Sequence, residues 1–159
     1  MTPQEIFDKV KASFDDRVLE TKSEGVIDPY IKLSPTAVAE AAHFLRDEPD
    51  LAFDTLMCLS GVDYTKGVLG VVYHLSSISK RHKITLKTEV PADSPQLPTV
   101  SSVWPGADWH EREAFDMFGI VFTGHPDLRR ILLPDDYPGY PLRKDFKVPE
   151  FYQGMKVPY

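Results

Sequence analysis

Residues 83–90 read Lys83-Ile84-Thr85-Leu86-Lys87-Thr88-Glu89-Val90 and alternate along their whole length. Successive side chains of a β-strand point to opposite faces, so Ile84, Leu86 and Thr88 share one face and the more polar residues between them share the other. This pattern is typical of a strand with one face in a core and the other in water, which is common in antiparallel sheets. The stretch therefore predicts a sheet with one buried face.

Two β-rich segments come before this strand, at residues 53–62 and 68–75. Short polar stretches separate the three segments, Thr65-Lys66-Gly67 after the first and Ser79-Lys80-Arg81-His82 after the second. Both stretches have the length and composition of hairpin turns. The segments together predict an antiparallel meander.

The N-terminus has the signature of a helix start. Thr2 is expected as the N-cap, Pro3 at the first helical position and Glu5 as the partner in a capping box. Ile6, Val10 and Phe14 follow at a spacing that places them on one face. We expect an amphipathic first helix packed on the sheet.

A further strand and a second helix are predicted before the meander. Residues 26–33 favour a strand, in which Pro29 removes a hydrogen-bond donor and so indicates an edge or a bulge. Ser34-Pro35 is expected to cap a helix that ends before Pro49. The face of that helix carries Val38, Ala41, Ala42 and Leu45.

The third predicted helix covers residues 108–118. Asp108 and Glu111 occupy capping-box positions, and Gly119 is expected to end the helix. Before it, residues 91–98 are expected to form a loop and residues 100–103 a short strand. The resulting order of elements predicts an α+β domain over residues 1–122, with helices packed on a mostly antiparallel sheet.

The character of the sequence changes after this domain. Residues 126–159 contain 6 of the 14 prolines and show no helical or strand periodicity. Disordered tails are usually poor in aromatic residues, whereas this segment has several, at Tyr137, Tyr140, Phe146, Phe151 and Tyr152. We therefore predict that residues 123–159 form an extended tail that docks on a partner.

Composition excludes several classes of function. The net charge of -6 disfavours nucleic acid and anionic membrane surfaces, because such partners are bound mainly through Lys and Arg. Cys58 is the only cysteine, which excludes an internal disulfide and a cluster held by four thiolates of this chain. Its apolar neighbours predict a buried, structural thiol.

The start of the chain lacks the features of a signal peptide and no segment is apolar enough to span a bilayer, so an intracellular, water-facing protein is expected.

Charged and large apolar residues are unusually dense in residues 109–120. On a helix Arg112 and Asp116 lie four residues apart and are able to pair, whereas Glu113 and Asp116 repel unless a cation from elsewhere lies between them. From spacing alone, the simplest interpretation is an ion-paired face in water.

A metal hydrolase is the main alternative from a different class. His110, Glu111, Glu113, His125 and Asp127 are all able to bind metals. Their spacing is poor, because adjacent helical residues diverge by about 100° and no His-Glu-x-x-His arrangement occurs. Cys58 and Ser60 also lack the context of a nucleophile, and no phosphate-binding or dinucleotide-binding glycine motif is present.

Several motifs in the second half of the chain resemble one known family. They are Glu111-Arg112-Glu113, Asp116-Met117-Phe118-Gly119-Ile120, His125-Pro126, Leu128-Arg129-Arg130-Ile131-Leu132 and Pro141-Leu142-Arg143-Lys144-Asp145. In order and spacing they resemble the C subunit of respiratory NADH dehydrogenase, also called the 30 kDa subunit of complex I, and its plastid and cyanobacterial relative, the J subunit. A weaker likeness extends to residues 61–64 and 72–75. Tyr137 departs from the pattern, since many members have Trp there, and the chain stops at Tyr159, before the long extensions of some members.

The resemblance implies a role in a complex and no catalytic, cofactor-binding or metal-binding residues on this chain. It implies a cofactor-free subunit in the peripheral arm of a proton-translocating NADH:quinone oxidoreductase, which scaffolds the large D subunit of the quinone module. Iron–sulfur clusters, quinone and a flavin are then expected in partner subunits. The expected location is the cytoplasmic face of the plasma (inner) membrane, reached only through the complex, in preference to a plastid or cyanobacterial membrane. An equivalent subunit of an energy-converting hydrogenase or a ferredoxin:quinone reductase is the closer alternative.

The predicted partner interface includes residues of the third helix and of the tail. Arg is favoured where planar ion pairs are partly desolvated, and aromatic side chains supply much of the binding energy of interfaces. The interface is predicted to contain Glu111, Arg112, Glu113, Asp116, His125, Arg129, Arg130, Tyr137, Tyr140, Arg143, Lys144, Asp145, Phe146, Phe151 and Tyr152.

Overall fold

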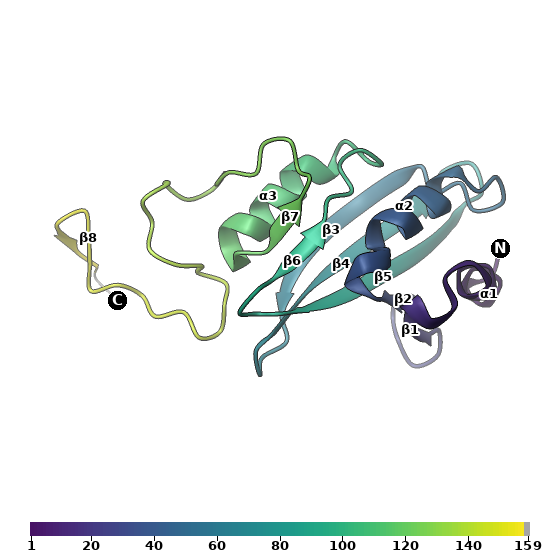
Figure 1. The fold of residues 1–159 in the computed structure, drawn as a ribbon, viewed down its shortest axis with the longest axis horizontal. Helices are drawn as coiled ribbons and strands as arrows, with labels where there is room; N and C mark the ends of the chain where they lie inside the picture. The colour runs from purple at the N-terminus through teal and green to yellow at the C-terminus, as the bar shows by residue number, and fades with distance from the viewer. Residues whose placement is uncertain (158–159) are drawn as a thin grey trace.

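The computed structural model describes residues 1–157 and confirms the α+β class. Its main sheet has five strands in the order β1-β2-β5-β4-β3 (Figure 1). The strands are β1 (Val18–Lys22), β2 (Tyr30–Leu33), β3 (Thr55–Asp63), β4 (Val68–Ser77) and β5 (His82–Pro91). The predicted antiparallel meander is confirmed as β3-β4-β5, whereas β2 runs parallel to β5. The sheet is therefore mostly antiparallel, with one parallel pair.

The alternation in β5 has the expected consequence. Ile84 and Leu86 are buried and lie opposite Leu75 and Tyr73 of β4, which are also buried. Thr85 departs from the pattern, since it lies on the other face and is buried too. Its N–H donates to the carbonyl of Pro29, which extends the parallel pairing of β2 with β5.

Two helices bury their apolar faces in the same core. Helix α1 (Pro3–Phe14) has the predicted capping box between Thr2 and Glu5 and buries the predicted apolar stripe. Helix α2 (Val38–Asp47) buries the predicted small residues. The prediction that Ser34 caps α2 was wrong, because a short 3-10 turn, Pro35–Ala37, comes first and the Ser34 side chain makes no capping hydrogen bond.

Two strand predictions before α2 need correction. The strand expected at residues 26–33 begins only at Tyr30, directly after Pro29. Strand β1 was not predicted, because Val18–Lys22 pairs only with β2 at the sheet edge and most of its side chains are exposed. An edge strand without a buried face leaves no alternation in the sequence.

The chain after β5 adds a small second sheet and the third helix. Strands β6 (Gln96–Pro98) and β7 (Val121–Thr123) pair in parallel, although residues 91–98 were expected to form a loop throughout. The short strand predicted at residues 100–103 is a turn, in which the N–H groups of Val103 and Trp104 donate to the carbonyl of Val100.

Helix α3 (Ala107–Phe118) has the predicted end but not the predicted start. Gly119 ends it with a left-handed backbone, φ 73°. The helix begins after Gly106 without a side-chain cap, so the capping box of Asp108 and Glu111 does not form. The Glu111 carboxylate instead bonds to residues 99 and 100.

Residues 126–157, here called the strap, run out from the domain as irregular chain (Figure 1). Near the end of the strap, β8 (Phe151–Tyr152) pairs with β9 (Met155–Lys156) in a small antiparallel hairpin. The predicted domain boundary at residue 122 stays a prediction. The end of the predicted tail, including Tyr159, lies outside the described residues.

Candidate functional site: helix α3 and the strap

A buried carboxylate on α3 holds the first part of the strap. Asp116 is completely buried, and its Oδ2 accepts hydrogen bonds from the backbone N–H groups of three consecutive strap residues. These donors are Ile131 at 3.0 Å, Leu132 at 2.7 Å and Leu133 at 2.9 Å. Its Oδ1 pairs with Nη1 of Arg130 at 3.1 Å. One side chain of α3 thus fixes the path of residues 130–133.

The surroundings of Asp116 favour its charged form. Burial by itself raises the pKa of a carboxyl group, but the three backbone donors and the Arg130 guanidinium outweigh it, so the pKa of Asp116 is lowered. The group is therefore a negative charge at neutral pH, compensated inside the chain.

Arg112 holds the same part of the strap from the preceding turn of α3. Its Nε donates to the carbonyl oxygen of Arg129 at 3.3 Å and its Nη2 to that of Arg130 at 3.4 Å. The guanidinium also lies over the ring of Trp109, 5.2 Å from its centroid. Helical spacing allows Arg112 to pair with Asp116, but in the described structure the two side chains do not pair. Each of them bonds to the strap instead. The interpretation of this face as ion-paired and in water was therefore wrong.

A second anchor lies at the end of α3. Nε of Arg143 donates to the carbonyl oxygen of Phe118 at 2.6 Å, which satisfies a group that the helix end leaves free. The guanidinium groups of Arg130 and Arg143 both lie near the Tyr140 ring, at 5.6 and 4.9 Å from its centroid. The same ring packs on Gly119, where a Cβ would come within 2.5 Å of it. Gly119 is thus needed both for the helix end and for the seat of Tyr140.

A third anchor joins the strap to the sheet. The N–H of Lys144 donates to Oδ2 of Asp63, at the end of β3, at 2.8 Å. The other oxygen of Asp63 accepts the N–H of Thr65 in the following turn at 2.7 Å. Both hydrogen bonds lower the pKa of Asp63. Residues 129–144 are therefore fixed to the domain at three places.

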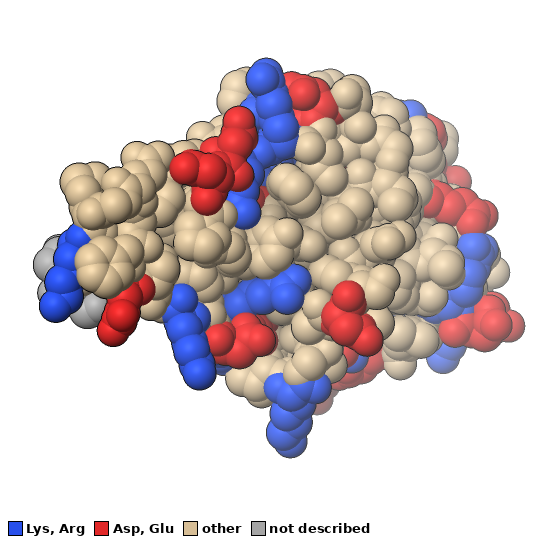
Figure 2. Space-filling view, turned by 60° about the vertical axis from the view of Figure 1, so that its left-hand side comes forward, with Lys and Arg blue, Asp and Glu red and all other residues tan. Residues whose placement is uncertain are grey.

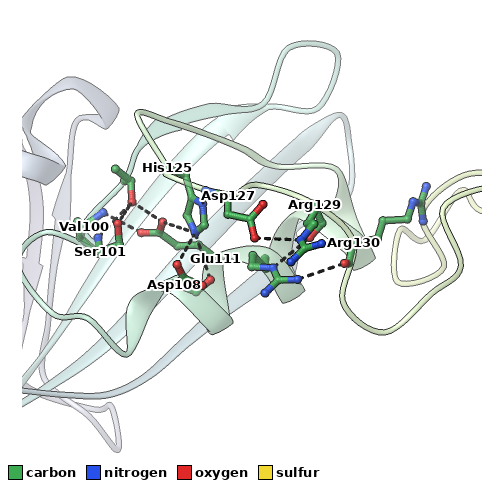
Figure 3. Close-up of polar contacts among 10 residues, drawn as sticks. Val100, Ser101, Asp108, Glu111, His125, Asp127, Arg129 and Arg130 are labelled. Atoms are coloured by element: carbon green, nitrogen blue, oxygen red, sulfur yellow. Dashed lines mark hydrogen bonds and ion pairs between the residues drawn. The ribbon is translucent and has the colours of Figure 1, made fainter.

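Glu111 and His125 form a separate buried cluster on the inner side of α3 (Figure 3). Oε1 of Glu111 accepts the N–H of Val100 at 2.7 Å, and Oε2 accepts the hydroxyl of Thr99. Nε2 of His125 lies 3.3 Å from the carbonyl oxygen of Asp108 and 3.8 Å from Oε2 of Glu111. Burial raises the pKa of Glu111, although the two hydrogen bonds and His125 oppose the shift. This cluster ties the loop before α3 and the chain after β7 to the helix.

The last part of the strap packs mainly on itself. The ring of Tyr137 lies 6.3 Å from that of Phe146 and 5.4 Å from that of Tyr152, measured between centroids. Asp136 accepts a hydrogen bond from the hydroxyl of Tyr152 at 2.9 Å. Three of the predicted interface aromatics are thus gathered into one small cluster.

Large apolar side chains remain exposed around α3 and along the strap. They are Trp109, Leu132, Leu142, Val148, Phe151 and Met155. Figure 2 shows the strap side of the molecule, where uncharged surface extends between separate basic and acidic side chains. Of these residues, only Phe151 was predicted to lie at the interface. For the strap residues among the others the signal was available, because apolar residues in a segment without periodicity have no core face to join. Trp109 lies on α3 and had no such signal.

The structure divides the predicted interface residues into two groups. Glu111, Arg112 and Asp116 are buried and His125 has a fully buried side chain, so these four act inside the chain. The others are exposed or half-buried, namely Glu113, Arg129, Arg130, Tyr137, Tyr140, Arg143, Lys144, Asp145, Phe146, Phe151 and Tyr152. The interface itself stays a prediction.

The residues considered as metal ligands do not form a metal site in the described part of the chain. Within residues 1–157, no three His, Cys, Asp or Glu side chains are placed so that they could hold a metal ion. No helix in that range is long and apolar enough to cross a membrane. Cys58, predicted to be buried, is partly exposed, and its Sγ lies 3.2 Å from Oγ of Ser60. Cys58 lies on β3, a strand at the edge of the sheet.

Comparison with known proteins agrees with the motifs of α3 and the strap. The chain is 46% identical to the C subunit of NADH-quinone oxidoreductase from Chlorobium phaeobacteroides, over 96% of this chain and 93% of that protein. It is 48% identical to the C subunit of the same enzyme from Chloroherpeton thalassium, over 94% of this chain, but spans only 63% of that longer protein.

Solved structures share the fold. The trypsin-resistant fragment of Nqo5 is 28% identical, with a TM-score of 0.65, and the match covers 80% of this chain and 100% of the fragment. A chain of the membrane-bound sulfane sulfur reductase, an archaeal respiratory membrane complex, is 26% identical, with a TM-score of 0.74, over 91% of this chain and 85% of that one. A family model described as "Respiratory-chain NADH dehydrogenase, 30 Kd subunit" matches residues 31–152, which include most of the sheet, α3 and most of the strap. The chain therefore belongs to the family of the 30 kDa subunit of respiratory-chain NADH dehydrogenase.

Proposed function

We propose that this chain is a cofactor-free subunit in the peripheral arm of a proton-translocating NADH:quinone oxidoreductase. In this role it holds the large D subunit of the quinone module in position and carries no catalytic residue. Family membership and the names of the relatives support the complex. The single cysteine supports the absence of a cluster, because a cluster usually needs four thiolates. Clusters, flavin and quinone then belong to other subunits.

The observation that carries the docking role is the strap itself. Residues 129–144 are fixed on α3 and β3, yet they hold Leu132 and Leu142 outward into water. Burying one such side chain is worth about 1.5–3 kcal/mol, so a partner that covers several of them gains substantial binding energy. Hydrogen bonds to the domain hold this part of the strap, so docking is expected to cost less conformational entropy than it would for a tail without such contacts.

The location follows from the complex. We propose that the chain lies at the cytoplasmic face of the plasma (inner) membrane and reaches the membrane only through its partner subunits. The net charge of -6 agrees with this, since direct binding to anionic lipids needs an excess of basic residues.

A related complex is the second candidate. The likeness to a chain of the sulfane sulfur reductase favours an equivalent subunit in another membrane-bound respiratory complex, such as an energy-converting hydrogenase or a ferredoxin:quinone reductase. The scaffolding role is the same in both cases. The proteins that co-purify with the chain distinguish the two, because an NADH-oxidising flavoprotein module is expected only in the first.

The docking role is tested by placing charge on the strap. We expect the double variant Leu132→Glu and Phe151→Glu to reduce recovery of the large subunit with the tagged chain from native membranes at least tenfold. Both side chains are largely exposed in the isolated chain, at 63% and 59%, so its melting temperature is expected to stay unchanged. Ile78→Glu is the control, since Ile78 is 73% exposed in the turn between β4 and β5. Unchanged recovery with the double variant would refute the role of the strap.

A further inference from the structure

A pocket lies between β3 and α3, separate from the two buried carboxylate clusters. Its volume is about 300 Å³, and its walls come from the sheet edge, the exposed side of α3 and the strap. Ala114, Phe118 and Leu142 give it an apolar floor, whereas Cys58, His110 and Glu113 contribute polar groups. The pocket thus has an apolar interior and a polar lining on the α3 and β3 sides.

Two backbone features shape this pocket. Gly61 allows the Phe118 ring to lie directly on β3, because a Cβ at that position would come within 2.6 Å of the ring. The N–H of Leu142 donates to the carbonyl oxygen of Met117 at 3.2 Å, which fixes the strap as one wall. The pocket is therefore part of the folded chain and continuous with the exposed apolar side chains of the strap.

Glu113 differs from the two buried acidic residues of α3. Glu111 and Asp116 are buried and have partners inside the chain, whereas Glu113 is exposed. Within residues 1–157 its carboxylate has no hydrogen bond or ion pair from another side chain. The lining of the pocket includes no Lys or Arg to neutralise it. A carboxylate beside an apolar floor complements a side chain with a long aliphatic stem and a cationic head.

We propose that this pocket receives one Lys or Arg side chain of the docked subunit, an inference that rests on the function proposed above. The aliphatic stem lies along Phe118 and Leu142, and the cationic head pairs with the Glu113 carboxylate. This explains why one acidic group of α3 is left without an internal partner. It also gives the interface a specific ion pair beside the apolar contacts of the strap.

Cys58 provides a reporter for the test, because it is the only cysteine, lines the pocket and is partly exposed. Its alkylation by N-ethylmaleimide is measured by peptide mass spectrometry in the free chain and in the purified complex. We expect at least fivefold slower alkylation in the complex. We expect Glu113→Lys to reduce recovery of the large subunit about tenfold. In the complex that this variant still forms, we expect Cys58 to be alkylated at the rate of the free chain.

Glu24→Lys is the matched control, since Glu24 is an exposed residue in the loop between β1 and β2. It is expected to leave both alkylation and recovery at wild-type values. Equal alkylation of the free and assembled chains, or equal protection in the wild-type and Glu113→Lys complexes, would overturn the proposed pocket occupant and leave the docking role intact. Failure of the wild-type chain to recover any large subunit would overturn both proposals.

Discussion

Arg130 of the strap forms an ion pair with the buried Asp116 of α3, with Nη1 of Arg130 3.1 Å from Oδ1 of Asp116. The three backbone donors on the other oxygen make Asp116 the main link between domain and strap. The domain therefore supplies both the hydrogen bonds and the ion pair that hold the first part of the strap.

Asp116→Asn removes the charge and replaces one acceptor oxygen with a donor that faces N–H groups. We expect a loss of about 3 kcal/mol in the free energy of unfolding, because a buried group loses its ionic partner and charged hydrogen bonds. Urea denaturation at pH 7 gives this value. A loss below about 1 kcal/mol, the value of an ordinary neutral hydrogen bond, would contradict the assigned role of Asp116.

The effect of Asp116 is expected to depend on pH. Its pKa in the folded chain lies below the ordinary value of 3.8, so its contribution is complete above that value and is lost as the pH falls through the lowered pKa. The difference in stability between the wild type and Asp116→Asn should therefore shrink at acid pH. Urea titrations at neutral pH and below pH 4 test this sign.

Glu111→Gln is expected to show the opposite dependence. Burial raises the pKa of Glu111 above 4.5, so its contribution is largest below that value and declines as the pH rises through the raised pKa. Gln does not titrate and keeps an acceptor for the N–H of Val100. The variant should therefore gain stability relative to the wild type between pH 4 and pH 8, as measured by urea denaturation across that range.

Gly119→Ala tests the seat of Tyr140. The positive φ of 73° and the 2.5 Å approach of the ring both oppose a Cβ, and we expect a loss of about 2–4 kcal/mol from backbone strain and overpacking. Gly106→Ala is the control, since its φ is -62° and nothing lies within 4 Å of an added Cβ. Thermal unfolding should show a lower melting temperature only for Gly119→Ala.

Two adjacent arginines are expected to separate stability from assembly. The side chain of Arg129 is 70% exposed and that of Arg130 only 15%. Arg130→Glu places a second negative charge against Asp116, so we expect it to lower the melting temperature of the isolated chain by several degrees. Arg129→Glu should leave that temperature within about one degree, because exposed ion pairs contribute little, and should reduce recovery of the large subunit. Equal effects of both variants on melting would argue against this division.

Much of the fold follows from local sequence. The capping box at Thr2 and Glu5, the alternation of Ile84 and Leu86 and the stop at Gly119 depend on contacts within a few residues. Such features are visible in the order of residues because backbone geometry sets the spacing of neighbours along one helix or strand. The family motifs in α3 and the strap are visible in the same way.

The roles of the acidic residues on α3 were decided only by the tertiary structure. Helical spacing offered Arg112 as the partner of Asp116, but the actual partner, Arg130, lies 14 residues away in a segment without periodicity. A buried carboxylate needs several hydrogen-bond donors at once. Three consecutive backbone N–H groups of the strap supply more donors than a single side chain on the same helix does. The sequence by itself determined that α3 and the strap carry unusual charge, whereas the packing of one on the other determined that Asp116 and Glu111 face inward and Glu113 faces out.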